Sequence, residues 1–444
     1  MNLYSTGGTM LRRKIMDQLL LWKNSQGKKT CLQLRGVRQC GKTFILRKFG
    51  EENYENVVEI NFIKQEQMRQ AFQGDLSVDT MVQYLSLLMP DASFVPGKTL
   101  LFLDEIQECP EARTSLKFWA EDGRYDVVTS GSQLGIAYKE SQNISVPVGF
   151  EEPITMYPLD FEEFLWACGI DEKLFALLRD YLDGKKIIPD ILYNTFLKKL
   201  REYMVIGGMP DVVNDWLRTK DYHVVQSTQE RIVRDYLDDI AKYASPGDRI
   251  KARNCYLSIP RQLIKENHKF QYSVVEKKAT ARKFESSLDW LAGADMIHYS
   301  RNVSTVAFPL EAYAIENQFR IYPSDIGLLC SMYGFQTKEA VVMDTISGSA
   351  KGALYESLIA DILLKKGHQL YYYKKQDSTL EIEFLLEEHG RIVPVEVKAS
   401  RGSSNSLNEL LKNEEIEKGY KLTSQNTGRV DKKITLPLFM AAFL

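Results

Sequence analysis

The sequence predicts an α/β protein of several domains, and two observations carry that prediction. Between residues 30 and 160, short apolar runs alternate with amphipathic stretches long enough for helices, which is typical of a parallel sheet covered by helices. The chain also has 444 residues, more than one ordinary hydrophobic core organises. Hydrophobic residues make up 44% and charged residues 26%, proportions that exclude a disordered or fibrous chain.

The first domain is predicted to span residues 1–165. Its apolar runs are nearly continuous rather than strictly alternating, as expected of parallel strands that are buried on both faces. The predicted strands are Cys31–Leu34, Val57–Phe62, Thr99–Leu103, Tyr125–Thr129 and Ile154–Tyr157.

Residues 166–345 are predicted to form a helical linker and a winged-helix-like middle domain. Asp160, followed three residues later by Glu163, is a helix-start signal, and the chain is then mainly helical to about residue 240. Short helices between 250 and 335 enclose two predicted strands, Met296–Ser300 and Val306–Leu310. This mixture fits a small helical domain with a β-wing.

Residues 346–444 are predicted to form a third domain, again of the α/β class. A Gly/Ser turn at 347–349 marks the boundary. The predicted elements are a helix at Ala353–Lys366 and strands at Gln369–Lys374, Leu380–Leu386 and Ile392–Lys398.

A phosphate-binding loop follows the first predicted strand. Residues 36–43 match the pattern GxxxxGK[ST] in full, with a strand before the loop and a helix after it. The glycines let successive backbone N–H groups face phosphates, Lys42 is expected to reach the β- and γ-phosphates, and the Thr43 hydroxyl is expected to bind Mg²⁺. The predicted ATP-binding residues are Gly36, Val37, Arg38, Gln39, Cys40, Gly41, Lys42 and Thr43.

Two further predicted strands end in residues suited to nucleotide hydrolysis. The run LLFLDE ends in Asp104, expected to hold Mg²⁺, and Glu105, expected to activate water as a general base. The run VVTSGS ends in Ser130 and Ser132, either of which suits contact with the γ-phosphate or the attacking water. Together with the phosphate loop, these residues predict an ATPase that uses ATP and Mg²⁺.

These motifs resemble a large group of prokaryotic AAA-family ATPases. The resemblance rests on GVRQCGKT, LFLDEIQECPEARTSLKFWAEDGRYDVVTSGSQLG and MYPLDFEEFL in the first domain, and on YMVIGGMPDVV, FRIYPSDIGLL and GALYESLIADILL beyond it. It implies a P-loop AAA domain, a helical or winged-helix middle and a C-terminal α/β domain of unknown function (DUF4143-type), often described as nuclease-like. It implies no settled substrate.

The chain departs from that group at one position. Members often carry a basic residue after the glycine of the segment PVGF, where this chain has Phe150. Arg113 and Arg38 are the alternatives within the chain for a nucleotide-contacting arginine, and the choice between them stays open. An arginine supplied by a neighbouring subunit would require a homo-oligomer.

Acidic residues in the third domain resemble the site of PD-(D/E)xK nucleases. Glu383 lies on one predicted strand, Glu396 and Lys398 share a face of the next, and Glu356 lies on the preceding helix. In such a site two carboxylates bind Mg²⁺ and the lysine activates water. Alternation of glutamate and apolar residues is equally typical of any half-solvated strand. Glutamate instead of aspartate at position 383 also fits an octahedral metal less well.

The charge balance allows only a confined nucleic-acid site. The net charge of −2 argues against a broad basic coat, but a cluster at Lys277, Lys278, Arg282 and Lys283 could contact DNA from a recognition helix. A solvated helix face explains these residues equally well. No apolar run reaches the length that spans a bilayer, and no cysteine pair has CxxC spacing. The expected location is therefore the cytoplasm.

The function predicted from these patterns is ATP hydrolysis that drives conformational change in the C-terminal domains. Two alternatives remain open from the sequence. One is an ATP-regulated DNA-processing nuclease, and the other is a nucleotide-dependent interaction switch with little hydrolysis and a protein partner.

Overall fold

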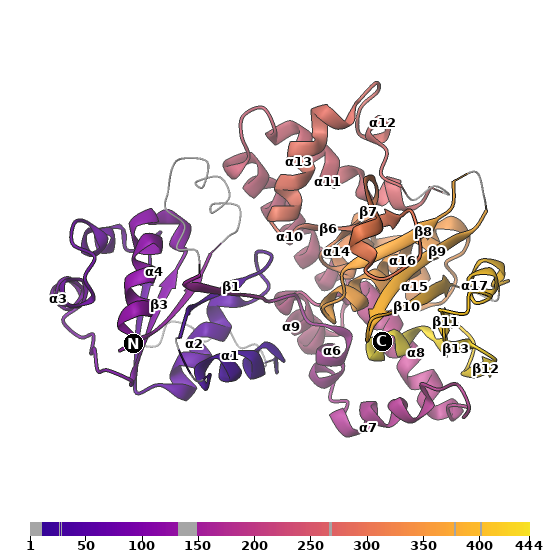
Figure 1. Ribbon diagram of the computed structural model, residues 1–444, viewed down its shortest axis with the longest axis horizontal. Coiled ribbons are helices and arrows are strands. Elements are labelled where there is room, and N and C mark those ends of the chain that lie inside the picture. Colours follow the sequence, from indigo (N-terminus) through magenta and orange to yellow (C-terminus); the bar gives the residue numbers. More distant parts are fainter. Residues whose placement is uncertain are drawn as a thin grey trace.

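The computed structural model describes residues 11–25, 27, 29–131, 149–265, 269–376, 379–399 and 402–444. Its described strands form two sheets, one of five strands and one of eight. Figure 1 shows the two sheets at opposite ends of the molecule, with α9 (Pro210–Thr219) and α10 (Tyr222–Tyr243) between them. The predicted α/β class is confirmed.

The first sheet has the order β2-β3-β4-β1-β5, and every neighbouring pair is parallel. Four of the five strands predicted for this region lie within two residues of the observed ones, whereas the fifth, predicted at Ile154–Tyr157, begins three residues earlier. The observed strands are β1 (Cys31–Arg35), β2 (Asn56–Asn61), β3 (Thr99–Asp104), β4 (Asp126–Ser130) and β5 (Glu151–Thr155).

Helices cover both faces of this sheet, which explains why its strands read as continuous apolar runs. Along β3, Leu101 and Leu103 pack on the side of α3 (Val78–Leu88) and α4 (Pro110–Asp122). Leu100 and Phe102 belong to a larger core that also holds α1 (Ile15–Lys23) and α2 (Lys42–Asn53). The parallel strands therefore share one C-terminal edge, where the polar residues that end them meet.

A helical region follows β5. The predicted helix start at Asp160 is confirmed, because its side chain and that of Glu163 form reciprocal hydrogen bonds with the backbone at the start of α6 (Phe161–Ala167). The remaining helices of this region are α7 (Glu172–Ala176), α8 (Asp190–Ile206), α9, α10, α11 (Arg249–Leu263), α12 (Tyr272–Val275) and α13 (Ala281–Gly293).

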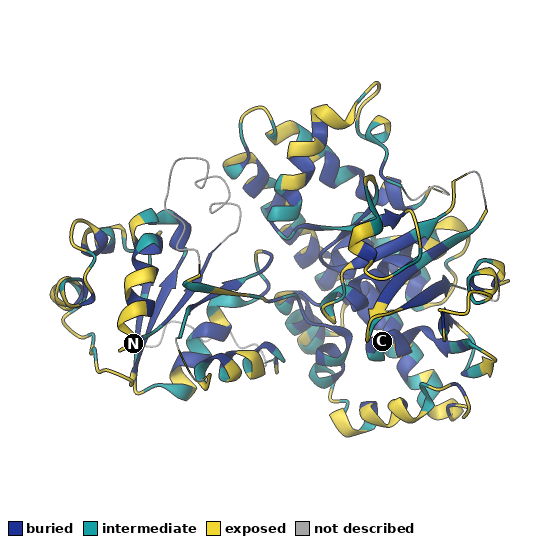
Figure 2. Ribbon diagram, in the orientation of Figure 1, coloured by how far each residue is buried: buried dark blue, intermediate teal, exposed yellow. Residues whose placement is uncertain are grey.

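The second sheet has the order β12-β13-β11-β10-β9-β8-β6-β7. Its strands are β6 (Ile297–Val303), β7 (Ala314–Pro323), β8 (Leu370–Lys374), β9 (Glu381–Glu388), β10 (Arg391–Lys398), β11 (Gly419–Thr423), β12 (Gly428–Val430) and β13 (Lys433–Pro437). The associated helices are α14 (Ile326–Met332), α15 (Phe335–Val342), α16 (Gly348–Lys365) and α17 (Asn405–Leu410). Figure 2 shows the strands of both sheets largely buried and the helix α7 at the periphery largely exposed.

The predicted strand Val306–Leu310 is wrong. Residues 304–309 form the turn between β6 and β7, and β7 begins only at Ala314. Pro309 lies within the predicted strand, and proline has no N–H group to donate to a sheet ladder. The hairpin therefore exists, but its second strand lies later in the chain than the apolar pattern suggests.

The predicted β-wing is also not a separate appendage. β6 pairs with β7 on one side and, in parallel, with β8 on the other, with Ser300 opposite Leu370. An unpaired side of β6 would present open N–H and C=O groups, and β8 satisfies them. The predicted boundary between residues 345 and 346 thus passes through one continuous sheet.

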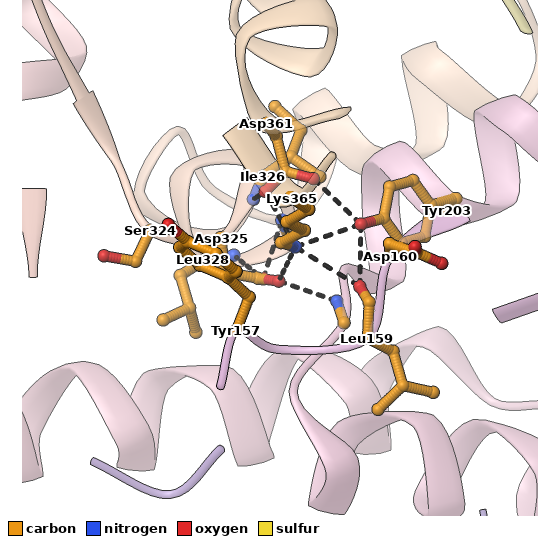
Figure 3. Close-up of polar contacts among 12 residues, drawn as sticks. Tyr157, Leu159, Asp160, Tyr203, Ser324, Asp325, Ile326, Leu328, Asp361 and Lys365 are labelled. Carbon is orange, nitrogen blue, oxygen red and sulfur yellow. Dashed lines mark hydrogen bonds and ion pairs between the residues drawn. The ribbon is translucent and has the colours of Figure 1, made fainter. Parts of the chain in front are cut away.

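A buried charged cluster joins α8, α14 and α16 to the start of α6 (Figure 3). The Lys365 ammonium lies 2.9 Å from the Asp361 carboxylate and 3.4 Å from that of Asp325. The Tyr203 hydroxyl lies 2.8 Å from Asp361 and 2.9 Å from the carbonyl oxygen of Leu159. Burial raises the pKa of Asp361 to about 6, while Lys365 opposes that shift.

Two glycines allow this cluster to close. The backbone N–H of Gly208 donates to Asp325 at 2.6 Å, and a Cβ at Gly207 or Gly208 would collide with Asp325 or Leu159. The GGMP and PSDIG segments therefore meet as a structural junction rather than as a ligand site.

Candidate nucleotide site

The phosphate loop leaves β1 at Gly36 and enters α2 at Lys42. Gly36 and Gly41 have φ angles of 139° and 100°, values in the region that favours glycine. A Cβ at Gly36 would also collide with the main-chain oxygen of Met156. The loop therefore turns tightly, and α2 begins after a residue with no capping side chain, which leaves its first N–H groups suited to phosphate.

The side chain of Lys42 contacts the backbone of this loop. Its ammonium donates to the carbonyl oxygens of Gly36 at 2.7 Å and Val37 at 3.0 Å. Both contacts are with neutral carbonyl oxygens, so this arrangement suits an anionic phosphate that competes for the same protons.

Asp104 is the centre of the polar cluster at the C-terminal edge of the sheet. It is buried and accepts hydrogen bonds from the Thr43 hydroxyl at 3.3 Å, the Asn61 side-chain amide at 2.8 Å and the Ser130 hydroxyl. Residues from the phosphate loop, β2, β3 and β4 thus meet at one carboxylate. The structure brings the predicted residues Thr43, Asp104 and Ser130 together, whereas Ser132 lies outside the described residues.

Sequence reasoning missed Asn61. It is the last residue of β2 and lies directly opposite Asp104 in the parallel register of β2 and β3. A polar residue that ends a strand next to the one carrying Asp104 is the signal that could have identified it.

The donor set at Asp104 fits Mg²⁺. The Thr43 hydroxyl and the Asp104 carboxylate offer the hard oxygen ligands that this ion takes together with substrate phosphates and waters. The three hydrogen-bond donors around Asp104 are neutral, so they leave its negative charge available to a cation.

Glu105 lies directly after β3, in a left-handed conformation with φ of 54°. Its carboxylate accepts a hydrogen bond from the side-chain amide of Gln107 at 2.5 Å. The amide therefore helps to fix the orientation of this carboxylate, on the residue that follows Asp104. Gln107 is buried and was also missed by sequence reasoning.

Both alternative arginines are engaged elsewhere. The buried Arg113 guanidinium lies 3.2 Å from Glu151 and joins α4 to β5. Arg38 forms an ion pair with Asp239 of α10. Phe150 packs against the core beside α3 and α4.

The second predicted site lies in the other sheet. Glu356, Glu383 and Lys398 line a cavity of about 560 Å³ near the start of α16. Glu396 is adjacent, with its carboxylate 3.4 Å from the Lys398 ammonium. The structure therefore brings the four predicted residues into one neighbourhood.

Carboxylates of this second site form ion pairs with Arg320 and Lys398. Arg320 of β7, only 1% exposed, lies 2.8 Å from Glu356 and also pairs with Glu381. The Lys398 ammonium lies 3.0 Å from Glu383. Burial raises the pKa of Glu383, and Lys398 opposes this shift only in part. Within the described ranges, no group of three or more His, Cys, Asp or Glu side chains could hold a metal ion, either here or at Asp104, so the difference between the two sites rests on these ion pairs. The residues here do not fit the Mg²⁺ that the nuclease resemblance implies.

The predicted basic cluster does not lie on one helix. Lys277 and Lys278 occupy the turn after α12, and Arg282 and Lys283 lie in the first turn of α13. All four are exposed, and Lys283 pairs with Glu276 at 2.5 Å. The chain turns before Thr280 because Lys278 takes a left-handed conformation with φ of 62°.

Family profiles match three segments of the chain. Residues 28–165 match an AAA domain, and residues 351–439 match a domain of unknown function, DUF4143. The chain carries an AAA domain followed by a DUF4143 domain. Between them, residues 197–339 of this AAA-domain protein match another domain of unknown function, DUF8612.

Solved structures show distant likenesses to this AAA-domain protein. A Walker-type ATPase of Pyrococcus abyssi is 13% identical with a TM-score of 0.42, over 73% of this chain and 96% of its own. The ORC2 protein of Aeropyrum pernix, in ADPNP and ADP complexes, is 12% identical with a TM-score of 0.40, over 78% of this chain and 97% of its own. At these TM-scores the likenesses carry no functional inference. No curated protein matches the chain.

Among the described helices, none combines the length and apolar character needed to cross a membrane.

Proposed function

We propose that this AAA-domain protein hydrolyses ATP with Mg²⁺ and uses the reaction to change the conformation of its C-terminal region. One observation carries this proposal: Thr43 of the phosphate loop contacts Asp104 at the C-terminal edge of a parallel sheet, where ligands of such sheets bind, and Lys42 and Glu105 are their neighbours in the chain.

Each residue has a distinct part in the proposed reaction. The Lys42 ammonium would turn from the loop carbonyls to the β- and γ-phosphate oxygens, and Thr43 and Asp104 would hold the metal. Mg²⁺, when bound, would neutralise charge that develops on the phosphates. Ser130, hydrogen-bonded to Asp104, would fix that carboxylate. The Glu105 carboxylate would accept a proton from the attacking water, once Gln107 has oriented it.

The test is ATP turnover by the full chain and by Lys42→Ala and Glu105→Gln. Each substitution is expected to reduce turnover by about 100-fold or more, because each removes a group that stabilises the transition state. Lys64→Ala, an exposed lysine beyond β2, is the matched control and should retain full turnover. Glu105→Gln should still bind ATP. Undiminished turnover in Lys42→Ala would contradict the proposal, and wild-type turnover no higher than background would favour the interaction switch.

DNA is a second proposed partner, supported by the exposed basic residues Lys277, Lys278 and Arg282 next to the β6–β7 hairpin. The order of helices and hairpin along the chain is that of a winged helix, and here the hairpin also forms the edge of the eight-stranded sheet. Reversal of these three charges to Glu should weaken duplex DNA binding and reduce its salt dependence, since phosphate contacts release counterions. Fluorescence anisotropy measures both. The same reversal at the exposed Lys173, Lys185 and Lys186 is the control, and equal losses would exclude a confined site.

A further inference from the structure

One face of α10 lies against the phosphate loop. The Gln39 side-chain amide donates to Asp235 at 2.7 Å, and Arg38 forms an ion pair with Asp239. The Tyr236 hydroxyl donates to the carbonyl oxygen of Arg38 at 3.0 Å. Positions 235, 236 and 239 share a helix face, so one surface of α10 contacts both the side chains and the main chain of the loop.

Two of these three α10 residues are buried, and Asp235 is half-buried. Tyr236 is 1% exposed and Asp239 is 5% exposed. Burial raises the pKa of Asp239, and the neighbouring Arg38 and Lys242 oppose that shift. A carboxylate in such a place is costly without its partner, because an unpaired buried charge loses its hydration.

The contacted residues belong to the part of the loop that phosphates must enter. Gln39 has a φ of 65°, a conformation that a non-glycine residue keeps only when its surroundings hold it. On the opposite side, the buried Arg13 guanidinium donates to the carbonyl oxygen of Cys40 at 3.2 Å. The shape of the loop therefore depends on side chains from outside the first sheet.

We propose that Asp235 and Asp239 are positioning residues of the nucleotide site, which make the shape of the phosphate loop and the placement of α10 depend on each other. The inference rests on the proposed function. Phosphates that enter the loop change the environment of Arg38 and Gln39, and α10 follows through its two carboxylates. Because coupling is reciprocal, α10 also sets the affinity of the loop for ATP.

The helix is well placed to transmit this change. Its buried residues Val225, Ile232 and Ile240 belong to the large core that also holds β6, α14 and α16. The Gln229 side-chain amide donates to the carbonyl oxygen of Ile206 at 2.8 Å, at the end of α8 beside the buried charged cluster. A shift of α10 therefore reaches the elements that carry the second sheet.

The experiment is hydrogen–deuterium exchange of residues 222–243 in the full chain, with and without a non-hydrolysable ATP analogue. Wild type should show a nucleotide-dependent change in exchange in α10. The double variant Asp235→Asn and Asp239→Asn should bind the analogue at least about fivefold more weakly, and its exchange should no longer respond. Asp238→Asn, an exposed neighbour on the same helix, is the matched control and should respond as wild type does.

Further variants and a kinetic measurement distinguish the possible outcomes. Arg38→Gln removes the same ion pair from the loop side and should also reduce the nucleotide-dependent change in exchange of α10. This variant keeps the test possible if the double variant does not fold. In steady-state assays, KM of the double variant should rise by a larger factor than its kcat falls. Asp239→Glu, which keeps the negative charge, should bind the analogue more tightly than the double variant does. Analogue binding by wild type without any response in α10 overturns this inference alone. No nucleotide binding by wild type overturns the proposed function as well.

Discussion

Two carboxylate sites, one in each sheet, differ in the groups that surround their acids. Asp104 accepts hydrogen bonds from two hydroxyls and an amide, all neutral. Glu356 and Glu383 are held by Arg320 and Lys398, both cations. Neutral donors orient a carboxylate and leave its negative charge available to a metal ion, whereas a nearby cation compensates that charge in an ion pair. The acids in the two sites look alike in the sequence, but only the first is prepared for Mg²⁺.

The largest effect is expected from Arg320→Met. It removes the buried cation and leaves the Glu356 carboxylate without its ion pair, which should destabilise the C-terminal region by about 3–5 kcal/mol. Thermal and urea unfolding of the full chain measure this loss. Adding Glu356→Gln should recover part of the stability. A fully stable single variant would show that Arg320 is not what holds this site.

Asp104→Asn is expected to reduce Mg²⁺-dependent ATP turnover by about 100-fold, or about 2.7 kcal/mol, because a metal ligand is lost. Phosphate release measures it. Glu383→Gln is the counterpart from the second sheet and should leave turnover within about twofold, since Glu383 lies on β9 and not in the sheet that carries the phosphate loop. Equal losses in both variants would remove the distinction between the two sites.

Asn61→Lys would make the first site resemble the second. An ammonium next to Asp104 should raise the Mg²⁺ concentration needed for half-maximal turnover by about tenfold, or about 1.4 kcal/mol. Asn61→Gln keeps a neutral amide and is the control. A Mg²⁺ requirement unchanged by the lysine would mean that the neutrality of these donors is unimportant.

The smallest effect is a pH dependence at Glu383. Burial raises its pKa in the folded protein above the ordinary value, more than Lys398 lowers it, so the folded state holds this proton more tightly than the unfolded state does. Its contribution to stability is therefore greatest at low pH and falls as pH rises above about 4.5. Glu383→Gln should flatten this slope in unfolding midpoints measured between pH 4 and 7. A slope identical to wild type would exclude Glu383 as its source.

Features that depend on local sequence could be predicted. The phosphate loop, Asp104 with Glu105, and the strands β1 to β4 of the first sheet follow from short motifs and apolar runs, whereas β5, with the sequence EEPIT, begins before the apolar run that predicted it. The hairpin after α13 was predicted with its second strand misplaced, because the pattern 306–310 is apolar but lies in a turn that includes Pro309.

Features that depend on distant pairing could not be predicted. Nothing in the local sequence shows that β6 pairs with β8, which begins 67 residues after β6 ends. Arg320 lies in a strand of mixed polar and apolar residues, and its importance arises only where β7 meets α16 and β9. Asn61 is an intermediate case, because a polar residue near the end of this predicted strand could have been noticed in the sequence.

The buried cluster of Lys365, Asp361 and Asp325 has a consequence for how the protein can be divided. A fragment limited to residues 351–439 would contain Lys365 and Asp361 but lose Asp325 and Tyr203, and the remainder would keep an acid without its cation. During synthesis, Gly208 of the GGMP segment can form its hydrogen bond only after Asp325 emerges, 117 positions later. The segments that the family profiles delimit are therefore smaller than the unit that these contacts join, which includes α8, α14, α16 and the second sheet.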